Sequence, residues 1–443
     1  MISRPSRRIW EALLPSVLND ARATVQHTSH GLLASLQSVG CCLDAAKIHS
    51  STSRNNSSTE ETSSSESTPL QKQGPYATRI KSRGVIRFDG QEVIKFLQGL
   101  TTNDVSQFDE EKQAKLPQPT PKQPVQVQPP VYTTLLNPQG RFLFDMFLYK
   151  PVYPVDKLDR TGSSPGSNGE GLPVLFADVD AASAEDLIHH LKKYRLRSKV
   201  EIQNISNNLS VWQRFGGGES KDSEVREGAD SVGWGGNKDL TGSTAAEGDA
   251  HGWRWYTDPR LRDLGSRGVF PANETPPLVE ANEQLSEEFY LLWRLEQGIP
   301  EGPTEIPTGE ALPLEYNLAG LNAISFDKGC YVGQELVART THRGVIRKRV
   351  MPVNFVKDNG EEAQQAVAPG AQIQDKRSGK KVGTVTTVLG SRGLALMRLE
   401  VSQKEAHDLA VDALEPVHVK VVRPKWWPSQ WGHEDEQRAV SSA

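Results

Sequence analysis

The stretch Lys328-Gly329-Cys330-Tyr331-Val332-Gly333-Gln334-Glu335 places a single cysteine between two glycines, with a lysine two residues before it. The glycines predict a tight turn, because glycine adopts backbone angles that other residues avoid. The next element is expected to start at Glu335. A nearby lysine favours the thiolate, which is the nucleophilic and metal-binding form of cysteine. The alternative is a passive, half-buried cysteine, since free cysteine is often a small buried hydrophobe.

Composition limits the classes of protein to which the chain can belong. Its 443 residues suggest two or three folded units, at roughly 100–200 residues each. The net charge of -4 gives no reason to expect a nucleic-acid-binding surface. No apolar run approaches the ~20 residues that cross a bilayer, so no membrane span is expected.

Residues 1–49 are predicted to be a mitochondrial transit peptide, because arginines alternate there with apolar residues that can form one helical face. An amphipathic helix of the mature fold is the alternative. The chain has three cysteines, and their spacing matches neither a disulfide framework nor a zinc site, which suits a reducing compartment. Cleavage would remove Cys41 and Cys42 and leave Cys330 as the only thiol.

Low-complexity segments separate the parts that are expected to fold. Residues 50–75 are predicted to be a disordered linker, since 15 of the 19 residues from 50 to 68 are Ser, Thr or Asn. Surface inserts rich in proline, glutamine, glycine or serine are expected near 111–130, 151–171 and 216–250.

Alternating strand and helix signals fill the main region, residues 76–340. A strand is predicted over 83–88, and a helix after it with Asp89 as its cap and Glu92 as the capping-box partner. A hairpin is predicted around the turn Asn137-Pro138-Gln139-Gly140. Its two strands, and three further ones, are expected over 131–136, 141–149, 172–177, 199–205 and 209–215. Two further helices are expected to start at Ser183 and Ser286.

Asp145 interrupts the second strand of this hairpin, where its neighbours are almost all apolar. A carboxylate in so apolar a run must either face solvent or have a partner. The alternation of an edge strand is one explanation for Asp145. A functional role is the other.

The C-terminal half is expected to change character after the cysteine. The loop 299–325 is long for a connector, which favours a binding or functional surface. Short strand signals at close spacing, over 349–356, 381–389, 394–399 and 417–422, then predict a small antiparallel β-barrel over 341–424. The last residues, 425–443, are expected to form a Trp-bearing tail.

Three stretches carry a family resemblance. They are FLQGLTTNDV at 96–105, DPRLRDLGSR at 258–267, and a run over 294–344 that extends from RLEQGIPEG through KGCYVGQELVAR. They resemble the YgfZ/GcvT-like family, which comprises folate-binding relatives of the glycine-cleavage T protein. The resemblance implies an α+β fold, with a ring of ferredoxin-like subdomains around a central folate pocket and a C-terminal antiparallel β-barrel.

The branch that the chain most resembles comprises mitochondrial iron–sulfur cluster assembly factors. The resemblance implies work in the mitochondrial matrix on [4Fe–4S] protein maturation, with A-type iron–sulfur carrier proteins and [4Fe–4S] client enzymes as partners. Cys330 would be one ligand of a cluster shared with a partner, since clusters normally take four thiolates. The signature residues are Lys328, Gly329, Cys330, Tyr331, Gly333, Gln334 and Glu335.

The resemblance also implies a tetrahydrofolate site, with Asn103, Asp145 and Arg267 as its contacts. A folate-dependent one-carbon transferase is therefore the alternative function, with Asp145 as the acid/base and Cys330 structural. A non-catalytic scaffold is a third candidate. The chain departs from the catalytic T proteins because Phe144-Asp145 carries one carboxylate where they have an acidic pair. Their G-Y-T-G-E type turn is also replaced, by residues 254–258, and no catalytic set is assigned.

Overall fold

The computed structural model describes residues 74–109, 128–151, 173–217, 254–363, 367–402, 408–412, 417–428 and 431. The predicted transit peptide lies outside these residues, as does the greater part of the predicted linker and of the three inserts. The assignments of these segments therefore remain predictions. None of the helices in the described residues combines the length and the hydropathy that a membrane span requires.

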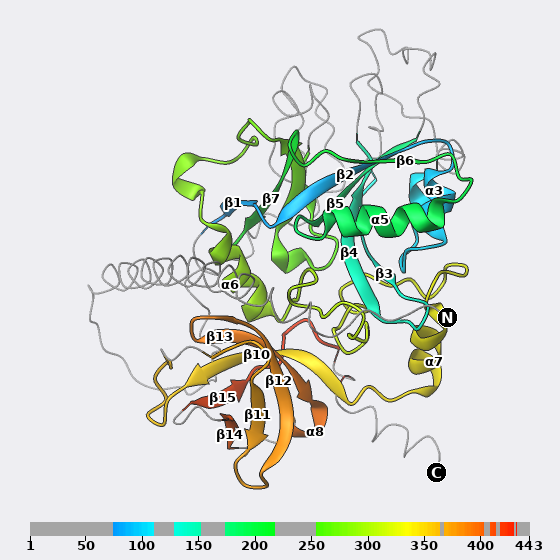
Figure 1. Ribbon diagram of the computed structural model, residues 1–443. Coiled ribbons are helices and arrows are strands. Elements are labelled where there is room, and N and C mark those ends of the chain that lie inside the picture. The colour runs from blue at the N-terminus through cyan, green and yellow to red at the C-terminus, as the bar shows by residue number, and fades with distance from the viewer. Residues whose placement is uncertain are drawn as a thin grey trace, which may run out of the picture. The chain divides into compact units, whose positions relative to one another are not determined.

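Two antiparallel sheets form the main region (Figure 1). The five-stranded sheet has the order β3-β4-β5-β2-β6, and the four-stranded sheet has the order β1-β7-β9-β8. The strands of the first are β3 (Val131–Leu136), β4 (Phe142–Tyr149), β5 (Val174–Asp180), β2 (Arg83–Asp89) and β6 (Glu201–Asn204). Those of the second are β1 (Tyr76–Ile80), β7 (Leu209–Phe215), β9 (Ser266–Pro271) and β8 (Tyr256–Thr257).

Two helices cover the five-stranded sheet and share its apolar cluster. They are α3 (Val93–Gln98) and α5 (Ala184–Arg195), which contribute Val93, Leu97, Leu187 and Leu191. The predicted hairpin is confirmed: Asn137 and Arg141 close its turn, and Gly140 there has a φ of 78° that favours glycine. The predicted strands at β2, β5, β6 and β7 are also confirmed.

The predicted capping box before α3 is wrong. Glu92, not Asp89, is the N-cap residue, and its side chain makes no capping hydrogen bond. Asp89 instead pairs with Arg87 on its own strand. The Glu92 carboxylate accepts a hydrogen bond from the backbone N–H of Lys199, 2.7 Å away. The Asp89 carboxylate thus pairs within its strand, and the Glu92 carboxylate bonds a residue far away in the sequence. A local capping pattern cannot reveal either contact.

The C-terminal strands close into a barrel in the order β10-β13-β12-β11-β14-β15 (Figure 1). Four of the six strands were predicted, namely β10 (Lys348–Val356), β12 (Lys380–Leu389), β13 (Arg392–Arg398) and β15 (His418–Val421). The other two, β11 (Gln372–Asp375) and β14 (Leu409–Val411), show no sustained alternating pattern. A short helix, α8 (Leu399–Ser402), follows β13.

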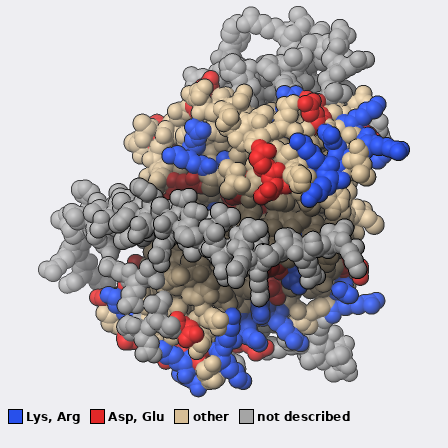
Figure 2. All heavy atoms as spheres, in the orientation of Figure 1, with Lys and Arg blue, Asp and Glu red and all other residues tan. Residues whose placement is uncertain are grey.

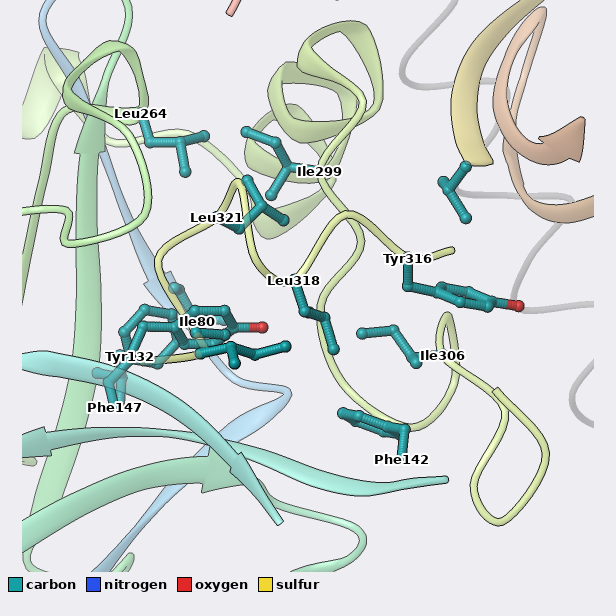
Figure 3. Packing of buried hydrophobic residues seen from close by; sticks show 14 of the residues in the cluster. Ile80, Tyr132, Phe142, Phe147, Leu264, Ile299, Ile306, Tyr316, Leu318 and Leu321 are labelled. Carbon is teal, nitrogen blue, oxygen red and sulfur yellow. The ribbon is translucent and has the colours of Figure 1, made fainter. Parts of the chain in front are cut away.

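The long loop 299–325 is part of the hydrophobic core, contrary to the expectation of a functional surface. Its buried residues share a cluster with both sheets and with Val350 and Leu394 of the barrel (Figure 3). Helix α6 (Glu287–Gln297) starts after Ser286 as predicted, ends at Gly298, and contacts β10 and β13. The loop therefore joins the main region to the barrel. Its buried residues include Ile299, Ile306, Leu314, Tyr316, Leu318, Leu321 and Ile324.

Tryptophans at the start of the predicted tail complete this junction. Trp427 is buried in the barrel cluster, and the Trp426 indole N–H donates to the carbonyl of Gln297. The Arg349 guanidinium lies 3.6 Å from the centre of the Trp431 ring. A side chain at Gly320 would clash with Trp431, so glycine is required in the loop at that point.

Candidate functional site

Cys330 is an exposed free thiol in the loop before helix α7 (Gln334–Arg343). Gly333 is the N-cap of α7 and has a φ of 82°, so the predicted glycine turn and the start of the next element are confirmed. Tyr331 is buried beside the cysteine, and burial raises the pKa of its hydroxyl to about 12. Gln334 and Glu335 form the first turn of α7, where Glu335 faces solvent.

Lys328 anchors this loop to the turn that follows α3. Its ammonium donates hydrogen bonds to the carbonyls of Gln98, Thr101 and Asn103, at 2.9, 2.6 and 2.9 Å. Burial lowers the pKa of Lys328 to about 8, although the charge of Asp104 opposes that shift. All three N–H bonds of the ammonium are directed at carbonyls. The lysine positions the loop.

Gly333 also allows α7 to pack against the β3–β4 hairpin. A Cβ at Gly333 would lie 2.5 Å from the carbonyl oxygen of Asn137 and 2.8 Å from the Cβ of Leu136. Gly140 meets Leu336 equally closely from the other side. Gly329 differs, because its φ is not positive and a Cβ there would meet nothing within 4 Å.

We expect Gly333→Ala to destabilise the protein by about 2 kcal/mol or more, since it combines a strained φ with backbone overlap. Gly329→Ala is the matched control and should change the free energy of unfolding by less than ~0.5 kcal/mol. Denaturant unfolding of the two variants measures this difference. Equal stabilities would contradict the assignment of Gly333 as the constrained glycine.

A buried ionic network joins the two sheets. Asp178 on β5 bridges two arginines, with its Oδ1 2.6 Å from Arg83 Nε and its Oδ2 2.7 Å from Arg267 Nε. Arg83 also contacts Asp145, through Nη1 and Oδ1 at 3.0 Å. These four side chains come from β2, β4, β5 and β9, so the network crosses from one sheet to the other.

Glu301, in the loop after α6, extends the network. It pairs with Arg267 at 3.2 Å and with Arg260, which also pairs with Asp258 at 2.7 Å. Burial alone would raise the pKa of Glu301. The charges of Arg267, Arg260, Arg294 and Arg83 outweigh burial and hold that pKa well below its usual range. The Phe147 ring lies 4.1 Å from the Arg267 guanidinium, which places the charges over an aromatic face.

Asp145 has partners and does not face solvent. Its strand β4 lies between β3 and β5, so the edge-strand explanation is wrong. The side chain is 1% exposed and accepts hydrogen bonds from Arg83, from the Tyr132 hydroxyl at 3.2 Å and from the backbone N–H of Gly302 at 3.1 Å.

The three residues predicted to contact folate do not form one open site. Arg267 is fully buried and paired as described above. The Asn103 side-chain amide donates to the carbonyls of Tyr132 and Asn322, and the backbone carbonyl of Asn103 accepts from Lys328. A crevice beside Asp145, lined also by Asp180 and Pro303, is too narrow to admit water. As arranged, the three side chains fit protein partners and do not fit a folate, so no chemical step is derived through folate.

Sequence reasoning missed Arg83, Asp178 and Glu301 as members of the network. The signal available for Asp178 was weak, an aspartate inside the apolar strand β5, whereas the arginine-rich turn after Asp258 does indicate a pairing of arginine with Asp258. The structure places Cys330 outside this network. Asn103 lies between the two, because it contacts Lys328 of the cysteine loop and Tyr132, whose hydroxyl reaches Asp145.

Within the described residues, no group of three or more His, Cys, Asp or Glu side chains could hold a metal ion. Cys330 is therefore a single exposed ligand without a second one beside it in that part of the chain. A cluster held there would need further ligands from outside the described residues.

Comparison with solved structures defines the class of protein. The glycine cleavage system aminomethyltransferase T from Bartonella henselae matches with a TM-score of 0.50 at 13% identity, over 82% of this chain and 88% of that one. Residues 347–429 match the model of the CAF17 C-terminal beta-barrel domain. The two sheets and the closed barrel thus form a GcvT-like α+β fold, as predicted.

Curated relatives give the particular family. The mouse protein "Iron-sulfur cluster assembly factor IBA57, mitochondrial" is 32% identical, over 79% of this chain and 85% of its own length. Its human counterpart is 33% identical over the same shares. A homologue from Mycosarcoma maydis is 29% identical, over 80% of this chain and 85% of its own. The chain belongs to the IBA57 family of mitochondrial iron–sulfur cluster assembly factors.

Proposed function

We propose that this protein acts in the mitochondrial matrix on the maturation of [4Fe–4S] proteins, with Cys330 as one ligand of a cluster that it shares with a carrier protein. The observation that carries the proposal is the exposed thiol in a loop fixed at both ends. Lys328 holds the loop before Cys330 through three hydrogen bonds, and Gly333 begins α7 after it. A fixed loop presents the sulfur to a partner at little entropic cost.

The ligand count supports a shared cluster over a resident one. Iron–sulfur clusters are normally held by four thiolates, and the described residues offer one exposed cysteine. The remaining ligands would come from the carrier, and A-type iron–sulfur carriers are the partners that we propose. The [4Fe–4S] client enzymes would then receive the finished cluster.

The direct test mixes the purified protein with a cluster-loaded A-type carrier and follows the visible absorption band of the cluster. We expect a band that co-elutes with both proteins on size exclusion. A band that stays with the carrier alone would contradict cluster sharing.

The one-carbon transferase is the weaker candidate because of the position of Asp145. A general acid/base must reach the proton that it transfers, and Asp145 is buried and bonded to Arg83, Tyr132 and Gly302. In this arrangement the Asp145 carboxylate stabilises the network between the sheets.

Tetrahydrofolate binding is implied by the family resemblance and stays a prediction. Calorimetric titration of the protein with tetrahydrofolate tests it independently of the cluster. Binding heat that Asp145→Asn weakens would restore the predicted contact. The absence of binding heat with the wild-type protein would rule out tetrahydrofolate binding, and the proposed role of Cys330 would not be affected.

A further inference from the structure

Leu196 is the most exposed large hydrophobic side chain in the described part of the chain, at 85% of its full accessibility. It follows the last residue of α5 and has a φ of 47°. A non-glycine residue with positive φ is conformationally strained. The fold therefore holds an apolar side chain in water on a strained turn, although leucine is normally among the buried residues.

Basic side chains surround Leu196 in the sequence. Lys192 and Lys193 on α5, and Arg197 and Lys199 after it, are all exposed. Figure 2 shows basic side chains gathered at the right-hand edge of the molecule in that view, near the end of α5 in Figure 1. Cations in the last turn of a helix complement its dipole, which accounts for the two lysines. The dipole does not account for Arg197 and Lys199 beyond the helix, nor for Leu196.

We propose that this basic leucine turn, residues 192–199, is a peripheral binding site for an anionic lipid bilayer. Leu196 would enter the boundary between the headgroups and the acyl chains. The four cations would contact lipid phosphates, with their aliphatic stems lying along the apolar layer. Anionic bilayers attract such clusters of lysine and arginine at short range. The site is separate from Cys330 and does not depend on cluster chemistry.

The composition favours a lipid surface over an acidic protein. Protein interfaces are depleted of lysine, and leucine is under-represented among their hot spots, which are rich in Trp, Tyr and Arg. This turn has three lysines and one protruding leucine. The second exposed large hydrophobe, Phe326 at 48%, is followed by Asp327 and by Lys328, whose side chain is buried, so it lacks exposed flanking cations.

The barrel provides a matched control for charge. Its turn 376–381 is as basic as the leucine turn, with Lys376, Arg377, Lys380 and Lys381 exposed, but it has no exposed large hydrophobe. If charge alone governed binding to a bilayer, the two turns would contribute alike. If the basic leucine turn is the site, only substitutions in that turn should weaken binding to the bilayer.

The experiment measures flotation of the full chain with vesicles of phosphatidylcholine, alone or mixed with phosphatidylglycerol. We expect binding to the mixed vesicles only, and weaker binding as salt rises. Leu196→Asn should weaken binding about tenfold, and asparagine tolerates positive φ better than most residues. Lys192→Glu with Lys193→Glu should weaken it by roughly 25-fold, at about fivefold per lysine.

Lys380→Glu with Lys381→Glu changes the net charge equally and should leave flotation unchanged. The Arg-rich N-terminal segment is common to all variants, so differences between variants are the readout. Wild-type protein that does not float with anionic vesicles would overturn the proposal. So would flotation that Leu196→Asn leaves unchanged, or that both charge reversals weaken equally, because either result means general electrostatic adsorption.

Discussion

Glu301→Gln should lower the free energy of unfolding by about 3–5 kcal/mol at neutral pH, since it removes one partner from a buried ion pair. Glu301 neutralises both Arg260 and Arg267, which are fully buried. Glutamine keeps the shape of the side chain but leaves these guanidinium groups with one negative charge fewer. Denaturant unfolding monitored by tryptophan fluorescence measures the loss.

The pH dependence of this loss is a second measurement on the same variant. The folded state holds the pKa of Glu301 well below the ordinary value of 4.5, because the arginine charges outweigh burial. Glu301 therefore contributes stability fully above that ordinary value, and the contribution is lost as pH falls toward the folded-state pKa. The difference between wild type and Glu301→Gln should be largest near pH 7 and should shrink below about pH 4.5.

A surface ion pair provides the control. Glu361 is exposed and lies 3.9 Å from Lys357, so Glu361→Gln should cost less than about 1 kcal/mol at any pH. If Glu301→Gln behaved like Glu361→Gln, the network would not be a source of stability, and the account of how the two sheets are joined would be wrong.

Cys330→Ser should abolish the shared cluster while leaving the fold intact. The thiol is exposed and serine is nearly the same size, so we expect a change in unfolding free energy below ~0.5 kcal/mol. A hydroxyl is a poor ligand for the iron of such clusters, which prefers thiolate. The cluster band that co-elutes with wild-type protein and carrier should be absent from the mixture with the variant.

Gly329→Ala is the matched control for Cys330→Ser, because it changes the adjacent residue in open space and keeps the thiol. It should melt normally and still form the shared cluster. A Cys330→Ser protein that melts normally and retains the cluster would exclude Cys330 as a ligand. A variant that unfolds would give the cysteine a structural role.

The sequence predicted the elements whose signals are local. The β3–β4 hairpin, the glycine turn around Cys330 and four barrel strands follow from turn residues and alternation within about ten positions. Family resemblance supplied the arrangement of the sheets, which local pattern does not contain. The strands β11 (QIQD) and β14 (LAV) were missed because neither shows a sustained alternation of apolar and polar residues, whereas the equally short β15 lies within the alternating run VHVKVV at 417–422.

The buried network could not be predicted because its partners are far apart in the sequence. Arg83 and Asp145 are 62 positions apart, Asp178 and Arg267 are 89, and Asp145 and Gly302 are 157. Asp145 was noticed as an anomaly in an apolar strand, yet the sequence did not identify Arg83 as its partner. The contacts of Lys328 could not be predicted for the same reason, since its carbonyl acceptors lie 225–230 positions earlier.

The contact of Trp426 and Trp431 with the 299–325 loop has a consequence for the order of events during synthesis. Gly320 lies directly against these indoles, and Gln297 accepts the hydrogen bond from Trp426, which lies 129 positions further along the chain. Such a contact cannot form before both of its ends have been synthesised. The ribosome must therefore extend the chain past Trp431 before the 299–325 loop meets these partners. A premature stop before Trp426 would leave this junction incomplete and its apolar residues exposed to chaperones and proteases.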